Sequence, residues 1–299
     1  MTLHADEHAA TPADLHRLLT VQAPQWAGIP LREAGHGTDN VMLRMGDDLV
    51  ARCPRTASTV PDLEKETTWL PLLAPQLTLE VPEMIFRGEP DEQYPFPWAV
   101  YRWIDGSEPD SATVQDWEGF GQDLGRFVGA LHGIPVPSEA TLPRCFRGGR
   151  LAAQLDAGLQ AIGQIGHSPS GKGLDLDAVE DLWRDLAATP QEVTRTVWLH
   201  GDLRGANLLV RDGRLTAVID FGTLGVGLPP AEHAPIWEFP RAARDAYRAA
   251  LDLDDTTWRL ARGWALLPSL TGLPYYWDSW PEFAALCRRR IDTLLASFD

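Results

Sequence analysis

The segment LHGDLRGANLLV, from Leu199 to Val210, places polar side chains between apolar runs of strand length. Burying such polar groups costs free energy unless each finds a hydrogen-bond partner. The run AVIDFG, from Ala217 to Gly222, repeats this pattern, with the carboxylate of Asp220 directly after three apolar residues. Asp212-Gly213 between the two runs predicts a tight β-hairpin. A fold that contains this stretch must therefore place polar side chains at the ends of a buried hairpin. The residues concerned are His200, Asp202, Asn207 and Asp220.

The spacing of these polar residues indicates a particular chemistry. Asn207 lies five residues after Asp202, and Asp220 lies thirteen residues after Asn207. Kinases use this spacing for their catalytic loop and for the metal-binding Asp-Phe-Gly segment. Phosphoryl transfer needs a carboxylate that aims an acceptor hydroxyl at the γ-phosphate, and hard oxygen ligands that hold a divalent cation. Each residue alone is typical of a turn, whereas the joint spacing between strands is not.

With these motifs the chain resembles the aminoglycoside phosphotransferases, a family of protein-kinase-like small-molecule kinases. The forms HGDL, NLL and VIDFG carry the resemblance, which is specific over residues 197–227, moderate over 35–105 and weak after Phe239. It implies an α+β, bilobal, protein-kinase-like fold with a small β-rich N-terminal lobe and a larger, mainly helical C-terminal lobe. It also implies ATP-dependent transfer of the γ-phosphoryl group to a hydroxyl of a small molecule, with an aminoglycoside-like antibiotic as the leading acceptor.

The resemblance assigns roles to the residues at matching positions. Asp202 would orient or deprotonate the acceptor hydroxyl, and His200 would hold the loop through packing or a hydrogen bond. Asn207 and Asp220 would bind Mg²⁺ ions that bridge the nucleotide phosphates. Gly222 would allow the sharp backbone that follows the metal ligand.

Periodicity and turn signals predict a lobe boundary near residue 105. Residues 1–105 are expected to form the nucleotide-binding lobe, with a hinge at about 99–105, and residues 106–299 the catalytic and acceptor-binding lobe. The first lobe should contain a helix over 11–19, strands NVMLRM and LVARCP, a helix over 62–73, and strands VPEMIFRG and WAVYRWI. The second should contain helices over 115–134, 151–162 and 177–188, and a helical part from about Arg241.

The N-terminal lobe also matches the family at positions that would contact a nucleotide. Gly35, Gly37 and Thr38 belong to a Gly-x-Gly segment whose backbone amides could meet a β-phosphate. Backbone groups of about Tyr101 to Trp103 would hydrogen-bond a purine edge. Because backbone recognition leaves little side-chain signature, ATP is expected and GTP remains the alternative.

Two departures from the family pattern concern charged residues. Arg52 stands where the family usually has lysine; it can still bind phosphate, although its reach and geometry differ. Glu66 is the preferred partner for Arg52, and Glu64 is the alternative. After Asp-Phe-Gly the family commonly reads G-D-P-x-x-D-L-A, whereas here Leu228 and Glu232 replace the two aspartates. Glu232 is therefore expected to brace the catalytic loop with one more methylene group, or to leave it without a brace.

The acceptor pocket is expected in the C-terminal lobe, where carboxylates could pair with ammonium groups and tryptophan faces could contact sugar rings. The same residues would equally suit a solvated acidic surface beside helix-packing aromatics. An aromatic-rich lobe would also suit a large apolar acceptor such as a macrolide, and an endogenous metabolite is a further alternative. The acceptor candidates are Glu232, Glu238, Trp277 and Asp278.

Composition limits the remaining function classes. The net charge of −16 disfavours binding to nucleic acids or anionic membranes, while a cationic partner is permitted. Three widely spaced cysteines and an N-terminus without a secretion signal favour the cytoplasm. These features carry no information on oligomeric state. A nucleotide-binding pseudokinase is the alternative from another class, favoured by Arg52 and opposed by the retained Asp202, Asn207 and Asp220.

Overall fold

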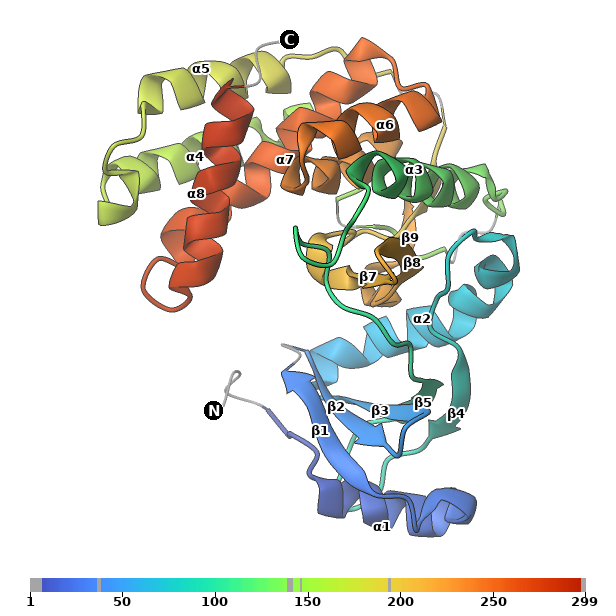
Figure 1. The fold of residues 1–299 in the computed structure, drawn as a ribbon. Helices are drawn as coiled ribbons and strands as arrows, with labels where there is room; N and C mark the ends of the chain where they lie inside the picture. The colour runs from blue at the N-terminus through green and yellow to red at the C-terminus, as the bar shows by residue number, and fades with distance from the viewer. Residues whose placement is uncertain (1–6, 37–38, 139–141, 146, 193–194, 297–299) are drawn as a thin grey trace.

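The N-terminal part of the chain is built on a five-stranded antiparallel sheet with the strand order β1-β2-β3-β5-β4 (Figure 1). The computed structural model describes residues 7–36, 39–138, 142–145, 147–192 and 195–296. Four strands match the predicted ones, whereas β1 was not predicted because its sequence, LREAGH, lacks an apolar alternation. The strands are β1 (Leu31–His36), β2 (Asn40–Met45), β3 (Leu49–Pro54), β4 (Met84–Gly88) and β5 (Trp98–Arg102).

Helices cover both faces of this sheet. On one face, α1 (Pro12–Gln22) packs Leu15 and Leu18 against a core that includes Trp98. On the other face, α2 (Val60–Leu73) packs Leu63 against Tyr101. Since successive side chains of a strand point to opposite faces, β5 must be apolar throughout, as the run WAVY is.

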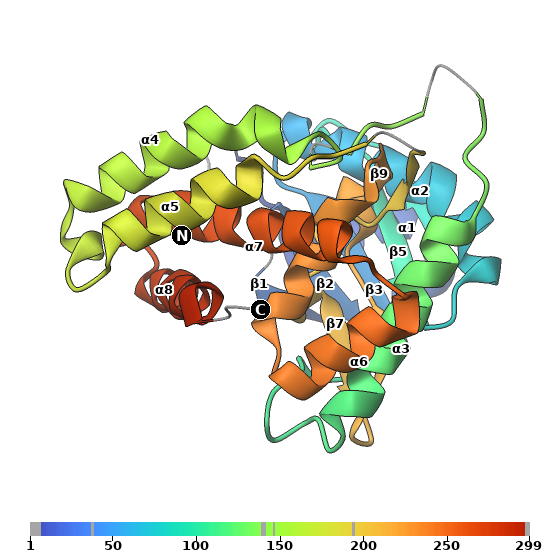
Figure 2. The same cartoon turned by 90° about the horizontal axis from the view of Figure 1, so that it is seen from above.

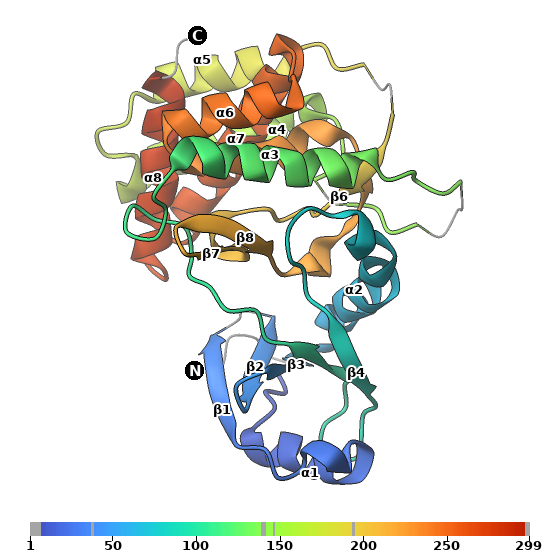
Figure 3. The same cartoon turned by 45° about the vertical axis from the view of Figure 1, so that its right-hand side comes forward.

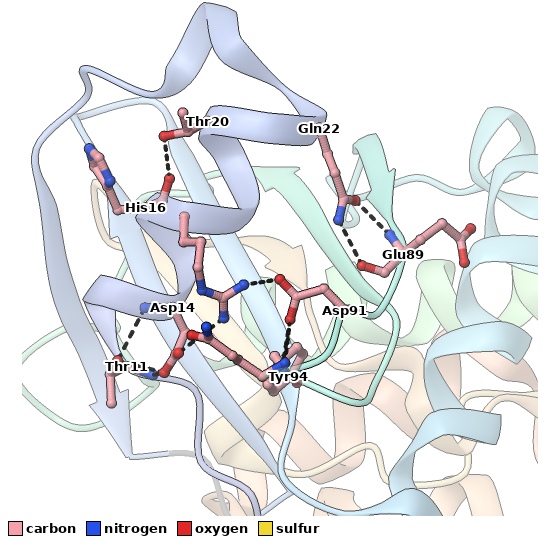
Figure 4. A network of polar contacts seen from close by, with 10 residues as sticks. Thr11, Asp14, His16, Thr20, Gln22, Glu89, Asp91 and Tyr94 are labelled. Atoms are coloured by element: carbon pink, nitrogen blue, oxygen red, sulfur yellow. Dashed lines mark hydrogen bonds and ion pairs between the residues drawn. The ribbon is translucent and has the colours of Figure 1, made fainter.

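The ends of α1 are fixed by polar contacts (Figure 4). Thr11 and Asp14 form a reciprocal cap at the first turn, which satisfies backbone amides that a helix start leaves open. At the other end, the Gln22 side chain pairs with the backbone of Glu89 through bonds of 2.9 and 2.8 Å. These contacts fix α1 to the loop that precedes β5, on the side of the sheet far from the C-terminal part.

The helix α2 packs against both parts of the molecule. Leu70 and Leu73 belong to the core of the C-terminal part, and the Trp69 ring lies 5.3 Å from the Trp198 ring. Farther along, Glu80 pairs with the strand at Thr216 through a backbone bond of 3.0 Å. The chain crosses to the C-terminal part after β5, in the segment that contains residue 105.

The C-terminal part is mainly helical, as predicted, with two short strand pairs that face the N-terminal sheet (Figures 2 and 3). The predicted hairpin is confirmed as β7 (Leu208–Arg211) and β8 (Arg214–Val218). The pairing of β6 (Val197–Leu199) with β9 (Gly225–Gly227) was not predicted. The helices are α3 (Trp117–Gly133), α4 (Leu155–Gly166), α5 (Leu176–Ala187), α6 (Arg241–Leu251), α7 (Asp255–Tyr275) and α8 (Pro281–Ala296).

The close packing of α3 on α6 requires a small residue at the contact. A Cβ atom added at Gly121 would lie 2.1 Å from the backbone oxygen of Ala243, which no side chain can tolerate. The predicted helix over 151–162 begins as a 3₁₀ turn at Leu151–Gln154 and becomes α-helical only from Leu155. Within the described residues, no helix is long and apolar enough to span a membrane.

Two buried histidines, His132 on α3 and His233 on the 3₁₀ segment Pro229–Glu238, pack together beside Tyr247 of α6. The His132 and His233 rings are 5.3 Å apart, and His233 Nδ1 is 2.8 Å from the Tyr247 hydroxyl. Burial lowers the pKa of His233 to about 3 and lowers the pKa of His132 well below its ordinary value. Both rings are therefore neutral in the folded protein at neutral pH.

This pair makes stability depend on pH. The unfolded chain binds a proton at His233 below about pH 6.5, whereas the folded chain does not until about pH 3, so stability falls as the pH drops through this window. Urea unfolding at pH 7 and pH 5 should show a loss of about 2 kcal/mol from His233. The double variant His233→Phe/Tyr247→Phe removes both polar partners and should lose less stability over the same interval. An equal loss in both proteins would contradict this assignment.

Candidate active site

The residues His200 to Asn207 form a loop between β6 and β7, and His200 holds it from the inside. Its ring is fully buried, with Nε2 2.9 Å from the Ile219 carbonyl and Nδ1 accepting from the Asp202 amide at 3.3 Å. The carbonyl partner indicates the tautomer that carries its proton on Nε2. The ring also packs against Phe221, at 4.5 Å. His200 therefore occupies the structural position expected for it and exposes no surface.

Asp202 and Asn207 lie side by side at the opening of the loop. The Asn207 amide nitrogen donates to the Asp202 backbone oxygen at 2.8 Å, which leaves the amide oxygen of Asn207 for another ligand. The Asp202 side chain keeps 27% of its surface exposed and lines a cavity of about 480 Å³. A carboxylate at a cavity wall is placed to accept a proton from a bound hydroxyl.

Asp220 follows β8 and points to the other side of the loop. Its backbone is left-handed, with φ 64° and ψ 65°, and its carboxylate is 51% exposed. The expectation that Gly222 supplies the sharp backbone is wrong, because Asp220 itself adopts that conformation. Gly222 instead leaves space, since an added Cβ atom would lie 3.3 Å from the Arg52 guanidinium.

Arg52, on β3, joins Asp220 to the N-terminal sheet. Its Nη1 donates to Glu66 Oε2 at 2.6 Å, and its Nη2 donates to Asp220 Oδ1 at 2.8 Å. In the amide orientation that satisfies both groups, the Asn40 oxygen accepts from Arg52 Nε at 3.1 Å and from Nη2 at 3.2 Å. Burial alone would lower the pKa of Arg52, but the Glu66 and Asp220 charges outweigh it and raise the pKa. Of the two candidate partners, the structure places Glu66 on Arg52, while Glu64 lies 3.7 Å from Arg87.

A second cavity, of about 310 Å³, lies where this ion network meets the loop. It is lined by polar groups at one end and by apolar side chains of the sheet and hairpin at the other. The polar residues include Asn40, Arg52, Glu66, Asn207 and Asp220, and the apolar ones include Met42, Val50, Leu209 and Ile219. This combination suits a ligand with an apolar planar part and a charged part.

The connecting segment after β5 lines the same cavity but differs from expectation in one respect. The Trp103 backbone amide donates to the Asp48 carbonyl at 2.8 Å, so it is not available to a purine. The Trp103 ring instead packs under the Arg44 guanidinium at 3.8 Å and donates its ring nitrogen to Asp105 at 2.6 Å. Tyr101 is buried at the cavity wall, where burial and the Glu66 charge raise the pKa of its hydroxyl.

The residues expected before β2 are partly outside the described chain. Gly35 lies near the end of β1, in the strand and not in a loop. Gly37 and Thr38 lie outside the described residues.

Glu232 braces the loop from the wall of the cavity that Asp202 lines. Its side chain is 2% exposed, and its two oxygens accept from the His200 amide at 2.7 Å and from the Gly201 amide at 3.1 Å. Burial raises the pKa of Glu232, while the His200 ring and the two amide bonds act in the opposite direction. The bracing contact is therefore present, and both Glu232 oxygens are engaged by the loop although the residue lines the cavity beside Asp202.

The other acceptor candidates separate into one that lines the cavity beside Asp202 and two that do not. Glu238 lines it, with one oxygen accepting from the Gly205 amide at 2.8 Å and the other from Arg290 at 2.6 Å. Trp277 packs against the core, and Asp278 is exposed at the α7–α8 turn, so neither reaches this cavity.

Sequence reasoning missed two residues that contact the site. Arg147 donates to Asp202 Oδ1 at 2.9 Å, and Asn40 lies against Arg52. Arg147 lies on a segment without periodicity, and no local pattern marks it. Asn40 is the first residue of the strand NVMLRM, which precedes the strand that carries Arg52, so the predicted pairing of these two strands is the signal that could have found it.

Comparisons with known proteins agree with this geometry. The sequence pattern of the phosphotransferase enzyme family matches residues 30–265. No curated protein sequence matches the chain.

Solved structures of phosphotransferases have the same fold. The GDP and kanamycin complex of APH(2'')-IIIa is 20% identical with a TM-score of 0.71, and the alignment covers 95% of this chain and 99% of that one. The macrolide 2'-phosphotransferase MphH from Brachybacterium faecium is 23% identical with a TM-score of 0.60, over 96% of this chain and 100% of that one. The ATP and streptomycin complex of APH(2'')-IIa is 15% identical with a TM-score of 0.61, over 96% and 97%.

The family match spans more than three quarters of the chain and includes the loop, the hairpin, Arg52 and Asp220. The chain is therefore a member of the phosphotransferase enzyme family.

Proposed function

We propose that this phosphotransferase moves the γ-phosphoryl group of ATP to a hydroxyl of a small molecule. The observation that carries the proposal is the position of the loop between two cavities. Asn207 lines the cavity that contains Arg52 and Asp220, and Asp202 lines the other. A phosphoryl donor in the first and an acceptor in the second would meet at the loop, as transfer requires.

The residues of the loop suit the chemical step. Asp202 would take the proton of the acceptor hydroxyl while that oxygen attacks the γ-phosphorus, the bond to the bridging oxygen breaks, and ADP leaves. Arg52 has five N–H donors, and its contacts with Glu66, Asp220 and Asn40 use four of them. The remaining Nη1 hydrogen would bind a phosphate oxygen.

The donor set also fits a magnesium ion. The Asn207 amide oxygen is left over after its nitrogen bonds to Asp202, and Asp220 has an exposed carboxylate. Both are the hard oxygen ligands that Mg²⁺ prefers. When bound, Mg²⁺ would neutralise charge on the phosphate oxygens. Nucleotide complexes among the similar structures support ATP, with GTP as the alternative donor.

The acceptor proposed first is an aminoglycoside-like antibiotic, as the similar aminoglycoside phosphotransferases suggest. The acceptor cavity also leaves a second class open: its carboxylates at Asp202, Glu232 and Glu238 have partners in the chain, whereas Glu108 and Asp110 line it at exposed positions. Its walls also contain several apolar side chains, which would suit an apolar hydroxylated acceptor such as a macrolide. These apolar residues include Trp117, Phe239, Trp264, Phe283 and Leu286.

A cytoplasmic location follows from the proposed use of ATP and is supported by three buried free cysteines, Cys53, Cys145 and Cys287. The pseudokinase alternative predicts nucleotide binding without turnover. Membership of a phosphotransferase family and the assembled loop residues favour the enzyme.

A turnover assay tests the proposed function. We expect at least one of four added acceptors to speed ADP release by the purified protein with Mg-ATP. The acceptors are kanamycin, gentamicin, streptomycin and erythromycin. Asp202→Asn should lower kcat about 100-fold or more, since the acceptor proton then has no base, while ATP affinity stays within about twofold. Asp212→Asn, in the exposed hairpin turn, is the matched control. Nucleotide binding without any stimulated turnover would favour the pseudokinase.

Arg52→Lys should lower activity although lysine is the usual family residue at this position. One ammonium group cannot keep the bonds to Glu66, Asp220 and Asn40 that the guanidinium makes. We expect kcat/KM for ATP to fall about tenfold, the effect of losing one charge-assisted hydrogen bond. Arg32→Lys, at an exposed position of β1, should leave kcat/KM unchanged. Equal or higher activity of Arg52→Lys would show that the guanidinium bridge is dispensable.

A further inference from the structure

Arg147 lies on a segment that is fixed to the strand pair behind the catalytic loop. The Cys145 amide donates to the Val226 carbonyl at 3.1 Å, and the Val226 amide donates to the Pro143 carbonyl at 2.7 Å. The Leu228 amide donates to the Gly148 carbonyl at 2.9 Å. These bonds tie the segment to β9. β9 pairs with β6, and β6 leads directly into the loop. The backbone on both sides of Arg147 therefore has a fixed position relative to the loop that carries Asp202.

The Arg147 side chain reaches both the carboxylate and the backbone of the loop. Its Nη1 donates to Asp202 Oδ1 at 2.9 Å and to the Gly201 carbonyl at 3.2 Å. Asn207 approaches the other carboxylate oxygen, Oδ2, at 3.4 Å, and this contact is long. Oδ1 is therefore committed to the guanidinium, and Oδ2 is the oxygen left for an acceptor hydroxyl.

The exposure of this ion pair shows where its effect should lie. The two side chains keep 33% and 27% of their surface accessible, and pairs of this kind contribute about 0–1 kcal/mol to stability. A terminal carboxylate torsion is broad and roughly two-fold, so a fixed cation on one oxygen selects the orientation of the other. Orientation of a reacting group affects rate far more than stability, because a displacement of about 1 Å can cost about 100-fold.

We propose that Arg147 is a positioning residue for phosphoryl transfer, which holds Asp202 Oδ1 so that Oδ2 faces the acceptor hydroxyl. The proposal rests on the proposed function, because it assigns Asp202 as the base. Arg147 acts through Asp202 and does not itself take the proton of the acceptor hydroxyl. Its effect on turnover must therefore depend on the Asp202 carboxylate.

A double-mutant cycle tests this dependence. ADP release from Mg-ATP is measured with the acceptors of the turnover assay and with water alone, for Arg147→Gln, Asp202→Asn and the combined variant. Arg147→Gln should lower kcat about 10- to 100-fold and leave the KM for ATP within about twofold. In the Asp202→Asn background the same change should lower kcat by less than about twofold, because the positioned group is already gone.

Two further variants separate positioning from folding. Arg147→Lys keeps a cation within reach of Oδ1 and should recover part of the lost kcat. Arg150→Gln, an exposed arginine three residues away, should match the unchanged protein in kcat and melting temperature.

The outcomes distinguish the two proposals. The role of Arg147 alone is overturned if the unchanged chain is active and Arg147→Gln has the same kcat. It is also overturned if Arg147→Gln lowers kcat as much in the Asp202→Asn background as in the unchanged chain. An unchanged chain that releases no ADP with any acceptor or with water overturns the proposed function and this role with it.

Discussion

The bridge that Arg52 makes between Glu66 and Asp220 sets the geometry on which the site depends. It connects the sheet, α2 and the end of the hairpin through bonds of 2.6 and 2.8 Å. Burying this charge costs desolvation that only good geometry offsets, so the bridge specifies an arrangement more than it adds stability. The planar guanidinium presents its donors in a fixed fork, and it can meet two carboxylates in different directions. An arginine at this position is therefore consistent with a site that aligns its two lobes before a nucleotide binds.

The loop at the centre of the site is held by hydrogen bonds to its backbone from neighbouring side chains. Glu232 accepts from two successive amides, and Thr223 donates its hydroxyl to the His200 carbonyl at 2.8 Å. Gly201 has a φ of +85°, and an added Cβ atom would lie 2.7 Å from the Thr223 backbone oxygen. Backbone groups that would otherwise bind water are thus committed, and the loop has few alternative conformations. Preorganisation of this kind reduces the reorganisation that a reacting group must undergo during transfer.

Local patterns were sufficient for the hairpin, most helices and the Asp202, Asn207 and Asp220 positions, because each depends on spacing within a short stretch. They were insufficient where the structure depends on distant contacts. The β6–β9 pair joins segments with no alternation to mark them. For Glu232 the sequence left open whether the brace forms, and only the contacts of its two oxygens with the amides of residues 200 and 201 decide it. The same limit applies to Arg147, whose position is fixed by backbone bonds to β9. A side chain's direction is a property of tertiary packing, and sequence spacing alone does not carry it.

The charge of the acceptor cavity illustrates the same point at the level of specificity. The chain has a net charge of −16, which by itself suggests affinity for polycations. Inside the cavity, however, Arg147 pairs with Asp202 and Arg290 pairs with Glu238. An ammonium group of an acceptor would have to displace an arginine to reach Asp202 or Glu238, whereas Glu108 and Asp110 line the same cavity at exposed positions. Discrimination between acceptors is a difference of binding free energies, and an unfavourable interaction with one class is as effective as a favourable interaction with the other. The local pairing of charges in the cavity is therefore a better guide to the acceptor than the acidity of the whole chain.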